Sequence, residues 1–134
     1  MGIDPGIAIV GYGFLELNGN SYKVLDYGAI TTMAKVPLPD RLNTIYSGMN
    51  DLIDKYKPQD IAFEELFFNK NVKTAITVAE ARGVEVLSAK KSGASLFEYT
   101  PLQVKQALVG YGRATKNQVQ EMVKMILNLK EVPK

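Results

Sequence analysis

Apolar residues recur along this chain with two different periods, and the change of period predicts where strands give way to helices. Residues 7–17 form an apolar run with several glycines, residues 18–20 (Asn-Gly-Asn) have hairpin-turn chemistry, and residues 21–32 form a return strand. Together with the short apolar segment that ends at Asp4, these runs predict an antiparallel meander of about three strands.

Helical spacing begins at residues 38–58, where apolar side chains recur three and four positions apart until Pro58 ends the pattern. These side chains are Leu42, Ile45, Tyr46, Met49, Leu52, Ile53 and Tyr56. A short, mostly buried strand is expected over residues 59–68, and a second helix over residues 71–93.

The last third predicts one strand and two helices. Residues 95–100 form the strand, and Thr100, followed by proline, has the chemistry of a helix N-terminus. Thr115 and Gln118 have the spacing of a capping box before the final apolar helix pattern.

The resulting order, β-β-β-α-β-α-β-α-α, is typical of an α/β fold. Three antiparallel strands followed by parallel ones predict a mixed five-stranded sheet with helices on both faces. Right-handed crossovers favour an arrangement in which the first strand is central, between the second strand and the strand at 59–68.

Composition narrows the chemistry. The chain has 134 residues, 46% of them hydrophobic, which suits one domain with a sizeable core. Cysteine and histidine are absent, so disulfides, Cys nucleophiles, His bases and Cys/His zinc sites are excluded. Any metal must be a hard cation with oxygen ligands, such as Mg²⁺ or Mn²⁺. No membrane span or secretory signal is recognisable, and the lack of cysteine is compatible with the cytoplasm.

Charge is distributed unevenly along the chain. Residues 1–65 carry five Lys/Arg against nine Asp/Glu, whereas residues 66–134 carry eleven against five. A basic half suits a polyanionic partner, although an ordinary solvated surface would have a similar composition.

Two carboxylates interrupt apolar strands. Asp4 precedes Pro-Gly, which by itself is ordinary turn chemistry, and Glu64 lies inside the strand at 59–68. If those strands are neighbours, Asp4 and Glu64 converge at adjacent strand ends and repel each other unless a cation joins them. That arrangement is typical of a divalent-metal site for phosphoryl chemistry, with an ion pair or simple exposure as the alternative.

Five motifs, in order along the whole chain, resemble those of the RuvC family of bacterial crossover-junction endonucleases. They are GIDPG, GYGF, FEELFFNKN, AEARGV and FEYTPLQVKQALVGYGRATKNQVQ. The first is weak alone, because sugar kinases and actin-like ATPases also use an Asp-Gly turn after a first strand, but the later blocks are highly specific.

The resemblance implies an RNase H-like fold and a homodimer that cuts four-way (Holliday) DNA junctions by paired symmetric nicks in recombination and repair. About two Mg²⁺ ions per site are implied, with Mn²⁺ able to substitute, and no covalent protein–DNA intermediate is needed. The implied partner is a branch-migration motor complex, and the implied location is the cytoplasm. The small residues Ala75, Ala79 and Gly83 would form the dimer seam.

The motifs also assign residues. Asp4 and Glu64 match the family's catalytic carboxylates, which hold the metal. Phe67 matches an aromatic side chain that wedges against bases near the exchange point, although core packing is an alternative and Phe68 could share the role.

Three basic residues are DNA-binding candidates. Lys105 and Lys116 match positions near the scissile phosphate, and Arg113 is a weaker candidate for a backbone contact. For each of them, ordinary surface solubility is the alternative.

The sequence departs from the family at both ends. A further acidic motif, Asp-x-x-Asp or a variant, should begin soon after Pro133, but the sequence stops at Lys134, and a few apolar residues before GIDPG are missing. We therefore interpret residues 1–134 as a single RNase H-like nuclease domain that lacks the C-terminal acidic helix. We expect this polypeptide to bind metal weakly and to cleave poorly or not at all, with Glu65 and Glu98 as unsupported substitutes.

Three other functions remain open. The chain could be a catalytically incomplete module that binds junction DNA, or a YqgF-like RNA-processing nuclease that prefers structured RNA. Half of an actin-like ATPase is less consistent with the sequence, because it needs a second Asp-Gly phosphate loop and a duplicated domain.

Overall fold

The computed structural model describes residues 1–66, 71–110, 115–127, 129–131 and 133. Its elements are β1 (Gly2–Asp4), β2 (Ile9–Asn18), β3 (Ser21–Thr31), α1 (Leu38–Tyr56), β4 (Asp60–Glu64), α2 (Val72–Lys91), β5 (Ser95–Tyr99), α3 (Pro101–Val109) and α4 (Lys116–Leu127). This order confirms the predicted sequence of strands and helices. No helix among these residues is long and apolar enough to cross a membrane.

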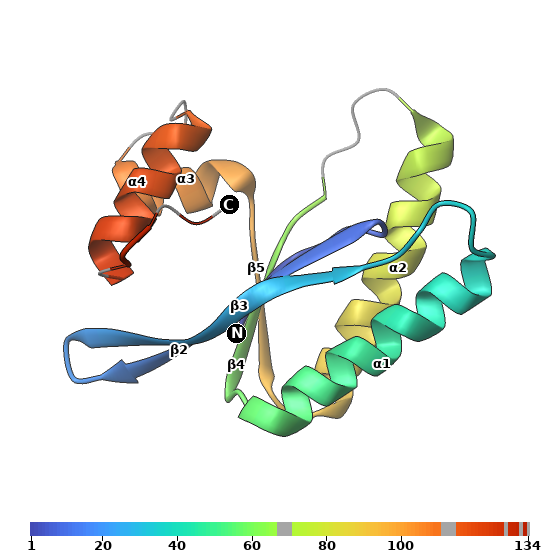
Figure 1. Cartoon of the computed structure of the whole chain (residues 1–134), viewed down its shortest axis with the longest axis horizontal. Helices are drawn as coiled ribbons and strands as arrows, with labels where there is room; N and C mark the ends of the chain where they lie inside the picture. The colour runs from blue at the N-terminus through green and yellow to red at the C-terminus, as the bar shows by residue number, and fades with distance from the viewer. Residues whose placement is uncertain (67–70, 111–114, 128, 132, 134) are drawn as a thin grey trace.

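The strands form one mixed sheet in the order β3-β2-β1-β4-β5 (Figure 1). β1 is antiparallel to β2 and parallel to β4, and β4 is parallel to β5. The predicted central position of the first strand is therefore confirmed, although this strand is only three residues long. Parallel strands need a crossover, and α1 supplies the one between the meander and β4.

One face of the sheet forms the core. The helices α1 and α2 cover it, and Figure 1 shows both of them on the same side of the strands. The buried apolar residues of this core are Ile3, Ile7, Val10, Ile45, Met49, Ile53, Ile61, Phe63, Ala81 and Ala89. The buried residues of α1 fall on the predicted apolar stripe, so the hydrophobic pattern correctly located its inner face.

The opposite face is only partly covered. α3 and α4 lie on that side at one end of the sheet (Figure 1), where Val123 and Leu127 line a groove with Gly13 and Leu15. Within β4, Ile61 and Phe63 are buried, but Ala62 and Glu64 on the other face are only half-buried and Asp60 is exposed. The expectation of a mostly buried strand is thus correct for one face only. The strand also ends at Glu64, short of the predicted residue 68.

Local capping defines the helix starts. Thr100 and Gln103 form both hydrogen bonds of a capping box, 3.0 Å and 2.8 Å long, and Thr115 forms the same pair with Gln118. Asn71 caps α2 by accepting hydrogen bonds from the next turn's amides, which explains why this helix begins at Val72.

An acidic side chain lies inside the core. Glu85 of α2 is 0% exposed, and among the described residues neither of its carboxyl oxygens has a hydrogen-bond partner. Burial raises the pKa of Glu85 to about 8, against opposing effects of the Arg82 charge and the Gly6 amide. The side chain therefore retains its proton at neutral pH, because ionisation would place an uncompensated charge in an apolar environment.

We predict that this proton makes the stability of the fold depend on pH. The Glu85 pKa is 4.5 in the reference state and about 8 in the fold, so the unfolded chain loses the proton first as pH rises. Stability therefore decreases between these two values, by up to about 1.4 kcal/mol per pH unit. Glu85→Gln removes this dependence, and its stability advantage over the unmodified chain should grow from pH 5 to pH 8.

Urea denaturation at several pH values measures that difference, with Ser88→Ala as a buried control on the same helix. Stability curves for the Gln variant and the unmodified chain that stay parallel across the range would contradict the prediction.

Candidate active site

The sheet register brings the two predicted carboxylates together. Gly2 pairs with Ala62 and Ile3 with Phe63 across the parallel β1–β4 ladder. One step further along the ladder, Asp4 lies beside Glu64, and both point away from the α1–α2 core because side chains alternate along a strand.

The two carboxyl groups influence each other directly. They share a side-chain hydrogen bond, and burial raises the pKa of both groups. The Asp4 charge raises the pKa of Glu64 further, while Lys105 lowers it. Two carboxylates held this close resist simultaneous ionisation unless a cation compensates them. The pair therefore has the electrostatics of a site for a hard divalent cation.

The backbone of the turn after Asp4 is tightly packed, and hydrogen bonds connect this turn to the end of β3. A Cβ atom on Gly6 would lie 2.2 Å from the Ile9 carbonyl oxygen, so only glycine fits this close approach. The Thr32 hydroxyl donates a 2.5 Å hydrogen bond to the Ile7 carbonyl and accepts one of 3.0 Å from Arg41 Nε. These contacts connect the turn to β3 and to the first turn of α1.

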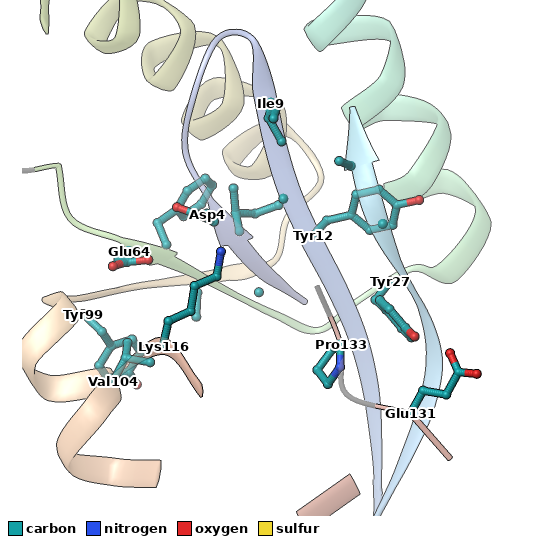
Figure 2. A pocket seen from close by; sticks show the side chains of 17 residues that line it. Asp4, Ile9, Tyr12, Tyr27, Glu64, Tyr99, Val104, Lys116, Glu131 and Pro133 are labelled. Carbon is teal, nitrogen blue, oxygen red and sulfur yellow. The ribbon is translucent and has the colours of Figure 1, made fainter. Parts of the chain in front are cut away.

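A cleft of about 970 Å³ opens over this part of the sheet (Figure 2). Its floor is formed by residues with little or no side chain, which leaves the backbone accessible: Gly2, Gly11, Gly28, Ala29 and Ala62. Opposite Asp4, a Cβ atom on Gly11 would come within 3.3 Å of the Asp4 Cβ, so glycine preserves the space for that side chain. Tyr99 and Val104 form part of the wall.

Two of the predicted basic residues belong to this site. Lys116 of α4 lines the cleft together with Asp4 and Glu64, and Figure 2 shows its amine extending toward the strand that carries Asp4. Lys105 of α3 is half-buried and close enough to Glu64 to affect its pKa. Phe67 and Arg113, which were also predicted to bind DNA, lie outside the described residues, as does Phe68.

Glu65 and Glu98, the two acids considered as substitute ligands, do not join the Asp4–Glu64 pair. Glu98 is aligned with Phe63 on the α2 side of the sheet and forms a 2.6 Å salt bridge with Arg82. Glu65 follows the end of β4 and is exposed. Within the described part of the chain, no group of three or more acidic, His or Cys side chains is placed to hold a metal ion.

The small residues of the predicted dimer seam lie along α2. Ala75 is half-buried, whereas Ala79 and Gly83 are exposed. Ala79 and Gly83 also line a shallow groove with Leu66 and Leu87, so this stretch of helix has an apolar surface without large side chains at its centre.

Sequence reasoning missed the residues behind the site. Thr32 and Arg41 support the turn through side-chain hydrogen bonds, and Glu85 lies against it from the core. No local motif marks these residues, because their partners are distant in the sequence. An acid on the apolar face of the helix at residues 71–93 was the one available signal for Glu85.

Comparison with known proteins agrees with this geometry. The family model described as "Crossover junction endodeoxyribonuclease RuvC" matches residues 1–134. The chain belongs to the RuvC family. It is 64% identical to the RuvC protein of Finegoldia magna and 61% identical to that of Ruminiclostridium cellulolyticum, over all of this chain and 82% and 81% of those proteins.

Solved RuvC structures have the same fold. The Thermus thermophilus RuvC structure is 34% identical and superposes with a TM-score of 0.90, covering 99% of this chain and 82% of that one. The structure of T. thermophilus RuvC in complex with a Holliday junction substrate is 35% identical with a TM-score of 0.93, covering 99% of this chain and 81% of that one. The expected RNase H-like α/β fold is therefore confirmed.

We predict that Gly6→Ala disrupts the turn that follows Asp4. The added Cβ would overlap the Ile9 carbonyl oxygen, so the backbone must open, which should lower the free energy of unfolding by about 1–3 kcal/mol. The control is Gly2→Ala, whose Cβ meets nothing within 4 Å. Thermal unfolding of both variants measures the effect, and equal stability of the two would show that the turn is not crowded.

Proposed function

We propose that this chain is a structure-specific endonuclease that resolves Holliday junctions by paired, symmetric, metal-dependent nicks in DNA recombination and repair. The observation that carries the proposal is the convergence of Asp4 and Glu64 on the glycine-floored cleft of a RuvC-family fold. The T. thermophilus relative that was solved with a Holliday junction supports the choice of substrate.

The residues present fit a divalent cation. Asp4 and Glu64 are paired oxygen donors whose pKa values are raised by burial, so a hard cation would relieve both the desolvation and the mutual repulsion. Mg²⁺ bound there would lower the pKa of a water ligand and compensate charge on a phosphate. Mn²⁺ has similar ligand preferences and is proposed to substitute.

The chain's own groups position the DNA. The small floor residues let a phosphodiester approach the backbone of β1 and β2, next to the paired carboxylates. Lys116 supplies positive charge from the α4 side of the cleft, and Lys105 supplies it beside Glu64. Such contacts hold the phosphate backbone in place without reading sequence.

Two carboxylates are few ligands for a tightly bound ion, and about two ions per site are proposed for this chemistry. With Asp4 and Glu64 as the only two ligands proposed among the described residues, residues 1–134 are proposed to hold the cation weakly. A role limited to junction binding is the second candidate function. A YqgF-like RNA-processing role is not favoured by the family match over residues 1–134. The cytoplasm is the proposed location, and the motor complex stays a prediction from the family.

A homodimer is proposed through the outer face of α2. The exposed apolar residues Val72, Ile76 and Leu87 are 75%, 56% and 54% exposed and share one helix face with Ala79 and Gly83. The opposite side of the helix packs on the core, so this stripe is available to a second copy. Small residues at its centre allow two helices to approach closely.

We predict that Asp4→Asn and Glu64→Gln each reduce junction cleavage in Mg²⁺ by about 100-fold or more, because one of the two anionic ligands is lost. Binding of a synthetic four-way junction in Ca²⁺ should stay within a few-fold of the unmodified chain. The matched control is Glu65→Gln, an acid next to Glu64 in the sequence but exposed beyond the strand.

Metal binding at this site can also be measured without DNA cleavage. Mn²⁺ should raise the melting temperature of the unmodified chain and of Glu65→Gln, but not of Asp4→Asn. Cleavage that survives in Asp4→Asn would rule out the proposed site, and junction binding without cleavage in the unmodified chain would favour the binding-only candidate.

We predict that Gly83→Gln weakens the dimer. A Cβ at this position meets nothing within 4 Å, so the fold tolerates a side chain, but a bulky residue keeps two helices apart. The dimer dissociation constant in analytical ultracentrifugation should rise about tenfold or more. The control is Thr74→Gln, an exposed position half a turn around the helix. A dimer unaffected by Gly83→Gln would place the interface elsewhere.

A further inference from the structure

The buried acid Glu85 has no role in the proposed chemistry, yet its position is unfavourable for stability. It is 0% exposed and, in the described part of the chain, both carboxyl oxygens lack a hydrogen-bond partner. A buried polar group without a partner typically costs about 1–3 kcal/mol, which leucine at the same place would avoid. This cost suggests that Glu85 contributes something other than packing.

The basic side chain whose charge lowers the pKa of Glu85 is already engaged elsewhere. Arg82, one turn earlier on α2, binds Glu98 through Nη2 at 2.6 Å and lies 6.0 Å from the centre of the Phe63 ring. Among the residues that the structure describes, its Nε is buried without a hydrogen-bond partner, so it does not hydrogen-bond to Glu85 either. Arg82 therefore influences Glu85 by charge alone and does not form an ion pair with it.

What faces Glu85 instead is the turn that carries Asp4. The Gly6 amide is directed at the Glu85 carboxyl group and lowers its pKa, without reaching standard hydrogen-bond geometry. The charge of Asp4 also raises the pKa of Glu85, as the smallest of its causes. Glu85 thus approaches the amide side of the turn from the core.

The turn is supported from two directions. On one side, Thr32 donates to the Ile7 carbonyl, and on the other, Glu85 lies against the Gly6 amide. Between Gly6 and Asp4 stands Pro5, whose φ is fixed by its ring and which restricts the preceding residue to extended backbone. Few soft dihedrals separate the Gly6 amide from the Asp4 side chain, so a displacement at Gly6 is transmitted to the carboxylate.

We propose that Glu85 is a positioning residue for the metal site: its buried carboxyl group lies against the amide side of Gly6 and thereby restrains the turn that orients Asp4. This inference rests on the proposed function, because it assigns Glu85 to the site at which Asp4 and Glu64 bind a cation. Glu85 touches neither the DNA nor the cation, and it acts through the backbone of the turn.

The experiment compares Glu85→Gln, which retains an acceptor oxygen, with Glu85→Leu, which fills similar space without one. Ser88→Ala is the control, since Ser88 is buried on the same helix and bonds only within it, to the Val84 carbonyl at 2.9 Å. Circular dichroism first establishes that each variant is folded. Amide hydrogen exchange at Gly6 and Mn²⁺ binding by calorimetry are then measured on the complete chain.

For Glu85→Leu we expect Gly6 exchange to be faster and the Mn²⁺ dissociation constant to rise, each by about tenfold, as is typical when a supporting contact of a metal ligand is lost. Glu85→Gln and Ser88→Ala should stay within about twofold of the unmodified chain. Normal Mn²⁺ affinity and normal Gly6 exchange in Glu85→Leu would overturn the proposal. So would equal losses in the Leu and Gln variants, because the acceptor oxygen would then be irrelevant.

The two proposals can fail separately. If the unmodified chain binds Mn²⁺ no better than Asp4→Asn, the metal site is wrong, and the assignment of Glu85 to it is wrong as well. If Mn²⁺ binding depends on Asp4 but not on Glu85, only the positioning role is overturned.

Discussion

The parallel pairing of β1 with β4 is the constraint on which the rest of this molecule depends. It places Asp4 next to Glu64 at the end of two short strands, although a hairpin and a whole helix separate them in the sequence. Parallel pairing requires the crossover that α1 provides, and α1 then covers the face of the sheet behind the site. The same pairing places the two carboxyl groups side by side in a partly buried position, and burial raises the pKa of each, an arrangement that favours a bound cation.

Because side chains alternate along these strands, one face of the sheet packs in the core while the other carries the carboxylates of the candidate site. Ile3 and Phe63 are 4% and 2% exposed on the helix-covered face, while Asp4 and Glu64 project from the other. The second face is built from glycine and alanine next to the carboxylates, so the backbone itself forms the floor of the cleft. Burial of apolar area on one side stabilises the fold by roughly 25 cal/mol per Å². The other side of the sheet can therefore carry charged groups and an open cleft.

The turn after Asp4 shows how support for a site is distributed over a fold. Thr32 comes from the end of β3, Arg41 from the start of α1 and Glu85 from the middle of α2. Three elements other than β1 therefore meet at the turn that carries Asp4. The carboxyl group of Glu85, which has no hydrogen-bond partner in the described part of the chain, is understandable in this context, because a core that served stability alone would have an apolar side chain there.

The sequence by itself determined the order of elements, the central first strand, the capping boxes and the pairing of Asp4 with Glu64. These features depend on local periodicity, on residue types at fixed short spacing and on the few topologies that right-handed crossovers allow. Only the tertiary structure decided that Glu98 pairs with Arg82 rather than with the site, that one face of β4 stays half open, and that Glu85 is buried beneath the turn. Each of these outcomes depends on which helix packs on which face and in what rotation, and that is set by contacts between residues far apart in the chain, which no local pattern records.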